Sequence, residues 1–233
     1  MDRKVSLCVP TWERTDMVIE AFEQVHDDER IDEIVIVDDA SNQDVYDWLF
    51  SKLHKYRKVF LSRNPENLDC YFNKARALKL AKNDWCILLD SDNIIDRKYL
   101  DTIYDYEWNE NVILTPCYAA PHFSFHAYSG ICVTQHNISE LIDKPLFEVA
   151  LNAMNYFVNK HQYLKVFDDT VNPHTSDSIY QAYNWLKSGK AIYITPRLKY
   201  EHRVHKNSHY QNNLHKTPEG FHNQILQSLR EMK

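Results

Sequence analysis

Short apolar segments alternate with amphipathic ones along the first ninety residues of the chain. The apolar segments are rich in β-branched and aromatic side chains, as strands are, and comprise residues 5–9, 34–37, 59–61 and 85–89. Between them, apolar side chains recur at helical spacing over residues 14–26, 43–56 and 68–82. This order predicts an α/β fold with a mainly parallel central sheet flanked by helices. In such a fold, ligands bind beyond the carboxyl ends of the strands.

The pattern becomes less regular from about residue 111 onward. Residues 112–115 and 191–194 are predicted as strands, and residues 145–162 and 177–188 as helices. Neither an internal repeat nor a change of composition marks a linker. We therefore expect a single domain over residues 1–233.

Two groups of acidic residues directly follow predicted strands of the first half. Asp38-Asp39 come after the second strand, and Asp90-Ser91-Asp92 come after the fourth. Alternate residues of an extended segment point the same way, so both carboxylates of Asp-x-Asp can face one site. Paired carboxylates repel each other unless a cation lies between them, and oxygen ligands suit Mg²⁺ or Mn²⁺ bridging a diphosphate. The alternative is that these acids cap helices or lie in solvated turns.

Composition excludes several classes of protein. The chain has three glycines, Gly130, Gly189 and Gly220, which lie too far apart for a G-x-G-x-x-G turn or a P-loop. Dinucleotide-dependent oxidoreductases and P-loop kinases are therefore excluded. The formal net charge of −6 argues against nucleic acid as a partner, because phosphate binding needs clustered basic residues.

The apolar content and the cysteines bear on location. The first ten residues hold no long apolar segment of a secretory signal, and no stretch approaches the roughly 20 apolar residues of a transmembrane helix. The five cysteines are odd in number and never closer than 15 positions, which favours reduced thiols. We expect a cytoplasmic protein without a transmembrane segment.

Four sequence blocks follow one another in the first half of the chain. They are Val5–Arg14 (VSLCVPTWER), Ile34–Ser41 (IVIVDDAS), Asn73–Ala81 (NKARALKLA) and Ile87–Asp92 (ILLDSD). In this order they resemble the nucleotide-sugar half of glycosyltransferase family 2. The resemblance implies a GT-A fold in which about residues 1–96 bind a nucleoside diphosphate sugar and about residues 97–233 bind the acceptor. It also implies a requirement for a divalent metal, Mn²⁺ or Mg²⁺.

The resemblance assigns roles to residues of these blocks. Asp92 resembles the direct metal ligand of the Asp-x-Asp motif, and Asp90 resembles the acid that holds ribose, a metal-bound water or the metal. Ala40 departs from the family pattern, which usually has glycine there, and this implies a slightly different turn after Asp39. The residues implied to border the nucleotide are Pro10, Thr11, Arg14, Asp39, Asn73, Lys74, Asp90 and Ser91.

The second half offers three acids as general base. Inverting members of the family use an acid on the acceptor side to deprotonate the acceptor hydroxyl. Asp177 opens a predicted helix and resembles that acid, although the usual Glu-Asp pair is reduced to one acid here. Its alternative role is that of a helix N-cap, a position that favours Asp. Asp168 and Asp169, in a predicted loop, are the competing candidates.

The segment from Arg197 to Thr217 is basic and rich in histidine. It contains five lysine and arginine residues and one acidic residue, which gives the segment a net charge of +4 in an otherwise acidic chain. Diphosphate binding requires such a local positive charge. It resembles the late histidine-containing loop of the family. The resemblance implies that His205 or His202 adds a metal ligand and that Lys206 pairs with phosphate. The alternative is a solvated basic tail.

These observations predict a metal-dependent, inverting glycosyltransferase. It would move a sugar from a nucleoside diphosphate donor, with a UDP- or dTDP-sugar favoured over a GDP-sugar, to a hydroxyl of an acceptor such as a glycan. A catalytically degenerate GT-A domain acting as a binding module is one alternative, which the single acid at Asp177 keeps open. A nucleotidyltransferase is another. The lack of glycine in Val9–Arg14 disfavours it, because those enzymes open with a glycine-rich phosphate loop.

Overall fold

Nine strands form one mixed sheet in the computed structural model, which describes residues 3–152, 155–205 and 214–233. Their order is β3-β2-β1-β4-β8-β5-β9-β7, with β6 paired to β5. Parallel pairs hold most of the paired residues, so the predicted α/β fold with a mainly parallel sheet is confirmed. The strands are β1 Val5–Thr11, β2 Ile31–Asp38, β3 Val59–Arg63, β4 Trp85–Leu88, β5 Val112–Ala120, β6 Phe123–Ser124, β7 Cys132–Val133, β8 Tyr156–Asn159 and β9 Ala191–Glu201.

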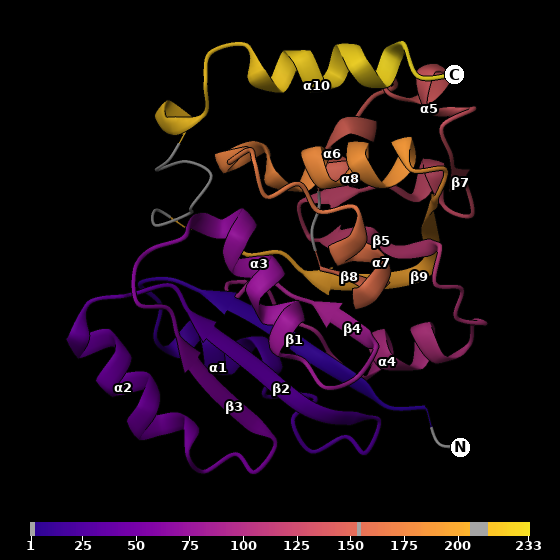
Figure 1. The fold of residues 1–233 in the computed structure, drawn as a ribbon. Coiled ribbons are helices and arrows are strands. Elements are labelled where there is room, and N and C mark those ends of the chain that lie inside the picture. Colours follow the sequence, from indigo (N-terminus) through magenta and orange to yellow (C-terminus); the bar gives the residue numbers. More distant parts are fainter. Residues whose placement is uncertain (1–2, 153–154, 206–213) are drawn as a thin grey trace.

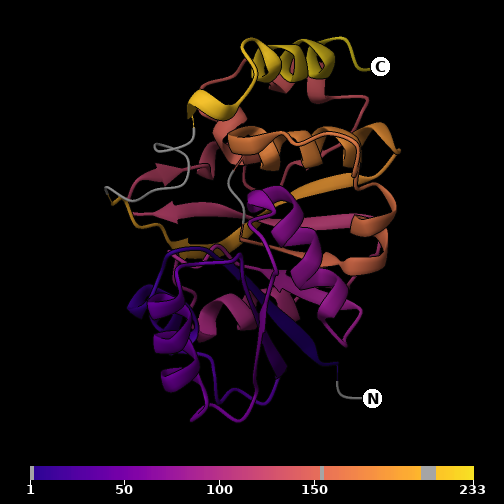
Figure 2. The same ribbon diagram turned by 60° about the vertical axis from the view of Figure 1, so that its left-hand side comes forward.

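Helices flank this sheet. Helix α3 packs on β1 and β2, whereas α10 packs on α5 and α8 at the end of the molecule opposite α2 (Figures 1 and 2). The α-helices are α1 Asp16–Phe22, α2 Gln43–Leu53, α3 Asp69–Leu80, α4 Arg97–Tyr104, α5 Ile138–Leu141, α6 Phe147–Asn152, α7 Lys160–Lys165, α8 Asp177–Lys187 and α10 Phe221–Arg230. The 3₁₀ turns are η1 His126–Tyr128, η2 His174–Ser176 and η3 Leu214–Lys216.

Strand β1 lies at the centre of the N-terminal half and is buried along its whole length. The hydroxyl of Ser6, a polar residue inside it, donates to Glu33 Oε1 at 2.6 Å, so its burial is compensated. Thr11 pairs with Asp38 at the end of β2, and the backbone N–H of Asp39 donates to the carbonyl of Thr11 at 2.8 Å. The carboxyl ends of β1 and β2 therefore meet at one edge of the sheet.

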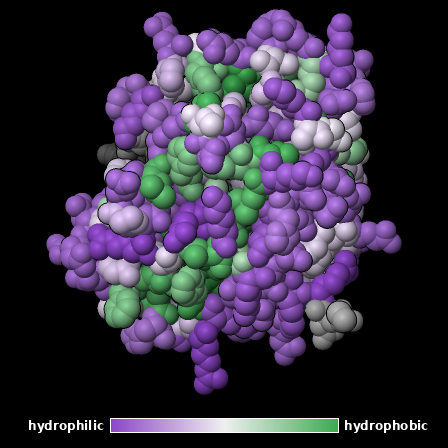
Figure 3. Space-filling model, viewed as in Figure 1, coloured by the Kyte–Doolittle hydropathy of each residue, from purple (hydrophilic) through white to green (hydrophobic). Residues whose placement is uncertain are grey.

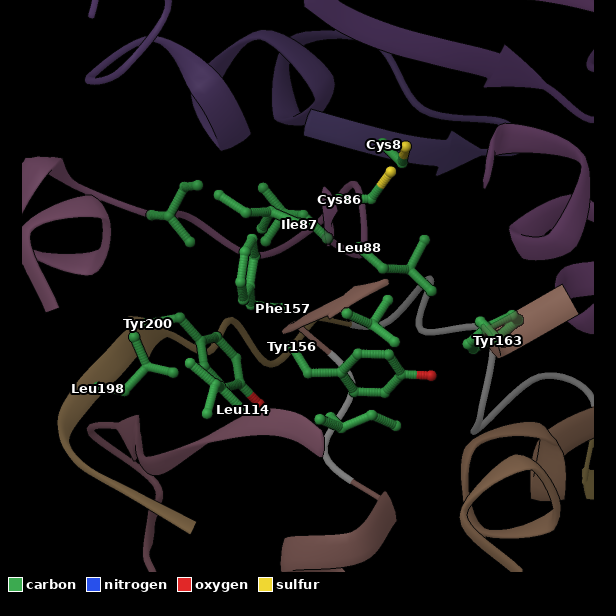
Figure 4. Packing of buried hydrophobic residues seen from close by; sticks show 14 of the residues in the cluster. Cys8, Cys86, Ile87, Leu88, Leu114, Tyr156, Phe157, Tyr163, Leu198 and Tyr200 are labelled. Carbon is green, nitrogen blue, oxygen red and sulfur yellow. The ribbon is translucent and has the colours of Figure 1, made fainter. Parts of the chain in front are cut away.

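The predicted helix over residues 145–162 is wrong. Its span holds α6, strand β8 and the start of α7. Strand β8 runs antiparallel between β4 and β5, and Phe157 packs against Ile87 and Leu114 in the core (Figure 4). The aromatic and β-branched run from Tyr156 to Val158 suits a doubly buried strand, and pairing on both sides outweighs the local helical pattern.

Other differences concern the length and number of elements. Helices α4 and α10 were not predicted, and the strands expected at 112–115 and 191–194 extend to Ala120 and Glu201. Asp96 is the N-cap of α4, and its carboxylate accepts from the backbone N–H of Tyr99. On the face shown in Figure 3 the surface is mostly hydrophilic, with hydrophobic side chains gathered in a band across it. Within the described residues, no helix is both long and apolar enough to cross a membrane.

Candidate active site

A cleft of about 1190 Å³ lies beyond the carboxyl ends of β1, β2 and β4. The loops after these strands and the first turns of α3 and α8 contribute to it, together with α6, α10 and the segment after β9. All eight residues predicted to border the nucleotide lie here. The lining residues are Pro10, Thr11, Trp12, Glu13, Arg14, Asp39, Ala40, Asn42, Asn67, Asp69, Cys70, Asn73, Lys74, Asp90, Ser91, Asp92, Asn93, Phe123, Glu148, Val149, Asn152, Thr175, Asp177, Ser178, Tyr200, His202, Arg203, Val204, Lys216 and His222.

The two acids after β2 have different environments. Asp38 is fully buried, accepts from the backbone N–H of Ser41 at 3.2 Å and pairs with Arg63 at 3.3 Å, so it stabilises the turn. Asp39 lines the cleft and accepts through Oδ1 from Asn64 Nδ2 at 2.7 Å and from the backbone N–H of Leu68 at 2.9 Å. Burial raises the pKa of Asp39 above its ordinary value. This carboxyl group is fixed in place before any ligand arrives.

Asn73 belongs to the same buried network as Asp39. Its side-chain amide donates to the carbonyl of Val37 at 3.0 Å, and its oxygen accepts from Asn64 at 3.0 Å. The first turn of α3 is therefore tied to the end of β2. Among the described residues, the buried hydroxyl of Thr11 has no hydrogen-bond partner, although it lines the cleft. The residue thus borders the cleft, while its hydroxyl lies below the cleft surface.

Ala40 adopts a backbone φ of 56°, in the left-handed region that favours glycine. The alanine therefore takes a conformation that costs a residue with a Cβ roughly 1–2 kcal/mol. We expect Ala40→Gly to raise the free energy of unfolding by about 0.5–1 kcal/mol, because relief of this strain exceeds the entropy cost of glycine. Thermal denaturation measures the change.

A matched control for this substitution is Ala182→Gly in α8, where the backbone is helical. It should lower the free energy of unfolding by about 1 kcal/mol or more, because glycine is a poor helix former. Equal destabilisation by both substitutions would show that the turn at Ala40 carries no strain.

Asp92 lies between two basic side chains contributed by distant parts of the chain. Its Oδ2 accepts from Arg14 NH2 at 2.6 Å and faces His205 Nε2 at 3.0 Å. Burial alone would raise the pKa of Asp92, but Arg14 and His205 together hold it below its ordinary value. Asp92 is therefore a charged carboxylate with an imidazole beside it.

Asp92 and His205 form a donor set that fits a divalent cation only in part. A carboxylate oxygen suits Mg²⁺ or Mn²⁺, and an imidazole nitrogen is a common metal ligand. Within residues 3–152, 155–205 and 214–233, no group of three or more His, Cys, Asp or Glu side chains is placed to hold a metal. A cation between Asp92 and His205 would therefore need further oxygen ligands, which a diphosphate can supply.

Lys74 forms ion pairs with two acids that line the cleft, Asp90 and Asp177. Its ammonium group lies 2.6 Å from Asp177 Oδ2 and 3.2 Å from Asp90 Oδ1. Burial opposes its charge, but the two carboxylates raise the pKa of Lys74 well above its ordinary value, so it stays protonated. Asp90 follows β4 and Asp177 opens α8, so one lysine of α3 joins elements from both halves of the chain.

Of the remaining predicted residues, some line the cleft and others do not. His202 lines the cleft, and its Nδ1 has no hydrogen-bond partner in the described part of the chain. Asp168 accepts from Tyr180 at 2.6 Å and from Thr170, and neither it nor the exposed Asp169 is among the lining residues. Lys206 lies outside the described residues.

Several lining residues were not predicted. Trp12 follows β1 and is 38% exposed. Its position next to the predicted Pro10 and Thr11 could have indicated that it lines the cleft. Glu148 and His222 form a pair with a 2.6 Å contact, and Asp69 pairs with His174 at the same distance. No local pattern marks these two pairs, because their members lie 74 and 105 positions apart.

Comparison with known proteins identifies the architecture. The model of "Glycosyl transferase family 2" matches residues 6–129, more than half of the chain. The crystal structure of TarS 1-349 from S. aureus is similar with a TM-score of 0.65 at 15% identity, covering 97% of this chain and 70% of that one. The mannosyltransferase PcManGT from Pyrobaculum calidifontis, in complex with GDP-Man and Mn²⁺, gives a TM-score of 0.63 at 15% identity, covering 99% and 70%.

A structure of TarS 1-349 in complex with UDP-GlcNAc is also similar, with a TM-score of 0.63 at 15% identity over 89% of this chain and 60% of that one. No curated protein sequence matches the chain. At identities this low the structural similarity concerns the fold, which is that of the GT-A glycosyltransferases.

Proposed function

The chain belongs to glycosyl transferase family 2 and is a glycosyltransferase that uses a nucleotide-sugar donor; from this premise we propose that it is metal-dependent and inverting. The donor we propose is a UDP- or dTDP-sugar, and the acceptor is a hydroxyl group of a glycan. TarS, one of the similar structures, binds UDP-GlcNAc, whereas PcManGT binds GDP-Man with Mn²⁺. These neighbours support a nucleoside diphosphate sugar and a divalent cation.

The observation that carries this proposal is the contact of Lys74 with both Asp90 and Asp177. A glycosyltransferase must hold the leaving diphosphate and the acceptor hydroxyl within one small site. Asp90 and Asp92 follow β4 on the proposed donor side, and Asp177, at the start of α8, shares the ammonium group of Lys74 with Asp90. Asp90, Asp92 and Asp177 therefore line the same cleft. Asp92 lies beside His205 and Arg14.

Each group has a separate task in the proposed reaction. Asp39 and Thr11 bind the nucleoside, since both residues line the cleft and the Asp39 carboxyl is held in place by Asn64. Asp177 accepts the proton of the acceptor hydroxyl. Arg14 and Lys74 supply fixed positive charge near the phosphates.

We propose that Asp92 and His205 hold the cation, with Asp90 beside them. When bound, Mn²⁺ or Mg²⁺ neutralises negative charge that develops on the leaving diphosphate. Because Asp92 and His205 supply only two donors, the nucleotide should bind together with the metal. This coupling distinguishes the proposal from that of a metal-independent enzyme.

Thermal denaturation with nucleotides and metal tests the coupling. We expect UDP or dTDP at about 100 times its dissociation constant to stabilise the protein by about 2.7 kcal/mol in the presence of Mn²⁺. For a chain of this size the melting temperature should then rise by roughly 5–10 °C. EDTA should abolish both this shift and the hydrolysis of nucleotide sugars, and added Mn²⁺ or Mg²⁺ should restore them.

Three results would separate the possibilities. Repeating the denaturation with GDP identifies the base that the protein prefers. A rise in melting temperature with GDP but not with UDP or dTDP would change the proposed donor to a GDP-sugar. Full activity in EDTA would refute the metal dependence. A protein that binds nucleotide with Mn²⁺ but hydrolyses no nucleotide sugar would be a binding module.

A further inference from the structure

The side chain of His222, near the start of α10, joins two other elements at the acceptor end of the cleft. Its Nδ1 lies 3.0 Å from Ser176 Oγ, and its Nε2 lies 2.6 Å from Glu148 Oε1. A neutral imidazole satisfies both contacts, with Nε2–H donating to the carboxylate and Nδ1 accepting from the hydroxyl. The contacts join α6, η2 and α10 through one ring.

The surrounding contacts place this group beside Asp177. Glu148 and Asn152 lie four residues apart on α6 and so share one face of that helix. Asn152 Oδ1 accepts from the backbone N–H of Ile179, in the first turn of the helix that Asp177 opens. Ser176 directly precedes Asp177. Glu148 and His222 therefore border the part of the cleft that the proposed general base faces.

A second set of bonds ties the C-terminal segment to the same turn. Thr217 Oγ1 accepts from the backbone N–H of Thr175 at 3.2 Å and lies 2.6 Å from the Thr175 hydroxyl. Lys216, next to Thr217, lines the cleft together with His222. The segment before α10 thus forms part of the cleft wall, and its bonds to η2 fix it there.

The arrangement of serine, imidazole and carboxylate is not a nucleophilic triad. Ser176 is 2% exposed and does not line the cleft, so its hydroxyl cannot reach a substrate. Glu148 is the accessible member, with 42% of its side chain exposed, and His222 is 31% exposed. The ring is anchored at the buried end and orients the carboxylate at the open end.

We propose that Glu148, oriented by His222, binds a hydroxyl group of a neutral sugar and thereby fixes the acceptor relative to Asp177. The inference rests on the proposed function and assigns its acceptor subsite. A carboxylate accepts hydrogen bonds from hydroxyl groups, and Asn152 and Val149 on the same helix add an amide and an apolar contact. Glu148 pairs with the His222 ring and, within the described residues, with no lysine or arginine, so its charge disfavours an anionic group at this position. Glu148 is a specificity-determining residue, and His222 is a positioning residue.

The test uses p-nitrophenyl glycosides of glucose, galactose, mannose and N-acetylglucosamine as acceptors, with UDP- and GDP-sugars as donors. Glu148→Gln should raise the KM for the glycoside by about tenfold or more, since a charge-assisted hydrogen bond is lost. The kcat for transfer, the KM for the donor and the rate of donor hydrolysis without acceptor should stay within about threefold of the native protein.

Further variants separate positioning from folding. His222→Ala should raise the acceptor KM in the same way, and His222→Gln should restore part of it because its amide can still donate to Glu148. The matched control is His215→Ala, in exposed η3 and outside the lining residues, which should change no kinetic constant. Loss of kcat and of donor hydrolysis in Glu148→Gln would instead indicate a structural role and overturn the proposal.

The outcomes distinguish a failure of the acceptor subsite from a failure of the proposed function. An unchanged acceptor KM in Glu148→Gln overturns the subsite. Donor hydrolysis by the native protein without transfer to any glycoside also overturns it, while the proposed function stands with a different acceptor. Absence of any donor hydrolysis counts against the proposed function itself, and the subsite falls with it.

Discussion

Substitution of Asp92 by asparagine should lower transferase activity by about a thousandfold, which corresponds to about 4 kcal/mol of lost transition-state stabilisation. Asparagine keeps the size of the side chain and one oxygen acceptor. It removes the negative charge that lies 3.0 Å from His205 and 2.6 Å from Arg14. Without this charge the cleft keeps its shape but loses the carboxylate that we propose to hold the cation.

The decisive measurement for Asp92→Asn is the rate of donor hydrolysis as a function of Mn²⁺ concentration. We expect the variant to need far more Mn²⁺ and to bind UDP with no enhancement by metal. Asp101→Asn is the matched control, because Asp101 is an exposed acid paired with Arg30 and lies outside the lining residues. Unaltered activity of Asp92→Asn would refute its role. A variant that fails to fold would show that the contact with Arg14 is structural.

Asp177→Asn should lower transfer by about 10²–10⁴-fold, the usual contribution of a positioned general base. The N-cap of α8 is Ser176 and not Asp177, so the alternative role of Asp177 as an N-cap is wrong and the helix should form normally in the variant. The donor should still bind, since Asp39, which we propose to bind the nucleoside, is held by Asn64 and the backbone N–H of Leu68 and not by Asp177. Transfer kinetics and calorimetry with UDP and Mn²⁺ measure the two effects separately.

The contact with Lys74 adds a second consequence for this variant. A buried ammonium group that loses one of two carboxylates is left less well compensated, so some stability should be lost. The comparison variants are Asp168→Asn and Asp169→Asn, outside the lining residues, which should retain transfer. Should Asp168→Asn or Asp169→Asn abolish transfer while Asp177→Asn remains active, the base lies in that loop, and Asp177 serves only to pair with Lys74.

The first half of the fold could be predicted because its signals are local. The run Ile34–Val37 is apolar on both faces, and the acids after it and after β4 stand where strands end. The second half could not, because the periodicity of a short apolar run such as Tyr156–Val158 does not distinguish a buried strand from a segment of a buried helix, and pairing with β4 and β5 decides between them.

The candidate site divides in the same way. Residue types and the order of the four blocks led to Asp39, Asp90 and Asp92. The partners of these acids and of Asp177 could not be predicted, because Lys74 and Asp177 lie 103 positions apart and Arg14 and Asp92 lie 78 apart. Sequence patterns report on neighbours along the chain, and these contacts depend on how the whole sheet is assembled.

The central position of β8 has a consequence for the order of assembly during synthesis. Strands β1 to β4 can pair as soon as the ribosome has released the first part of the chain, but the free edge of β4 must wait for residues 156–159. An unpaired edge strand is a template for association with other chains. Such long-range pairing is also slow, because the intervening loop must close before any contact forms. The nascent N-terminal half therefore has a period of vulnerability to aggregation that ends when β8 docks, and chaperone binding would be most useful during that interval.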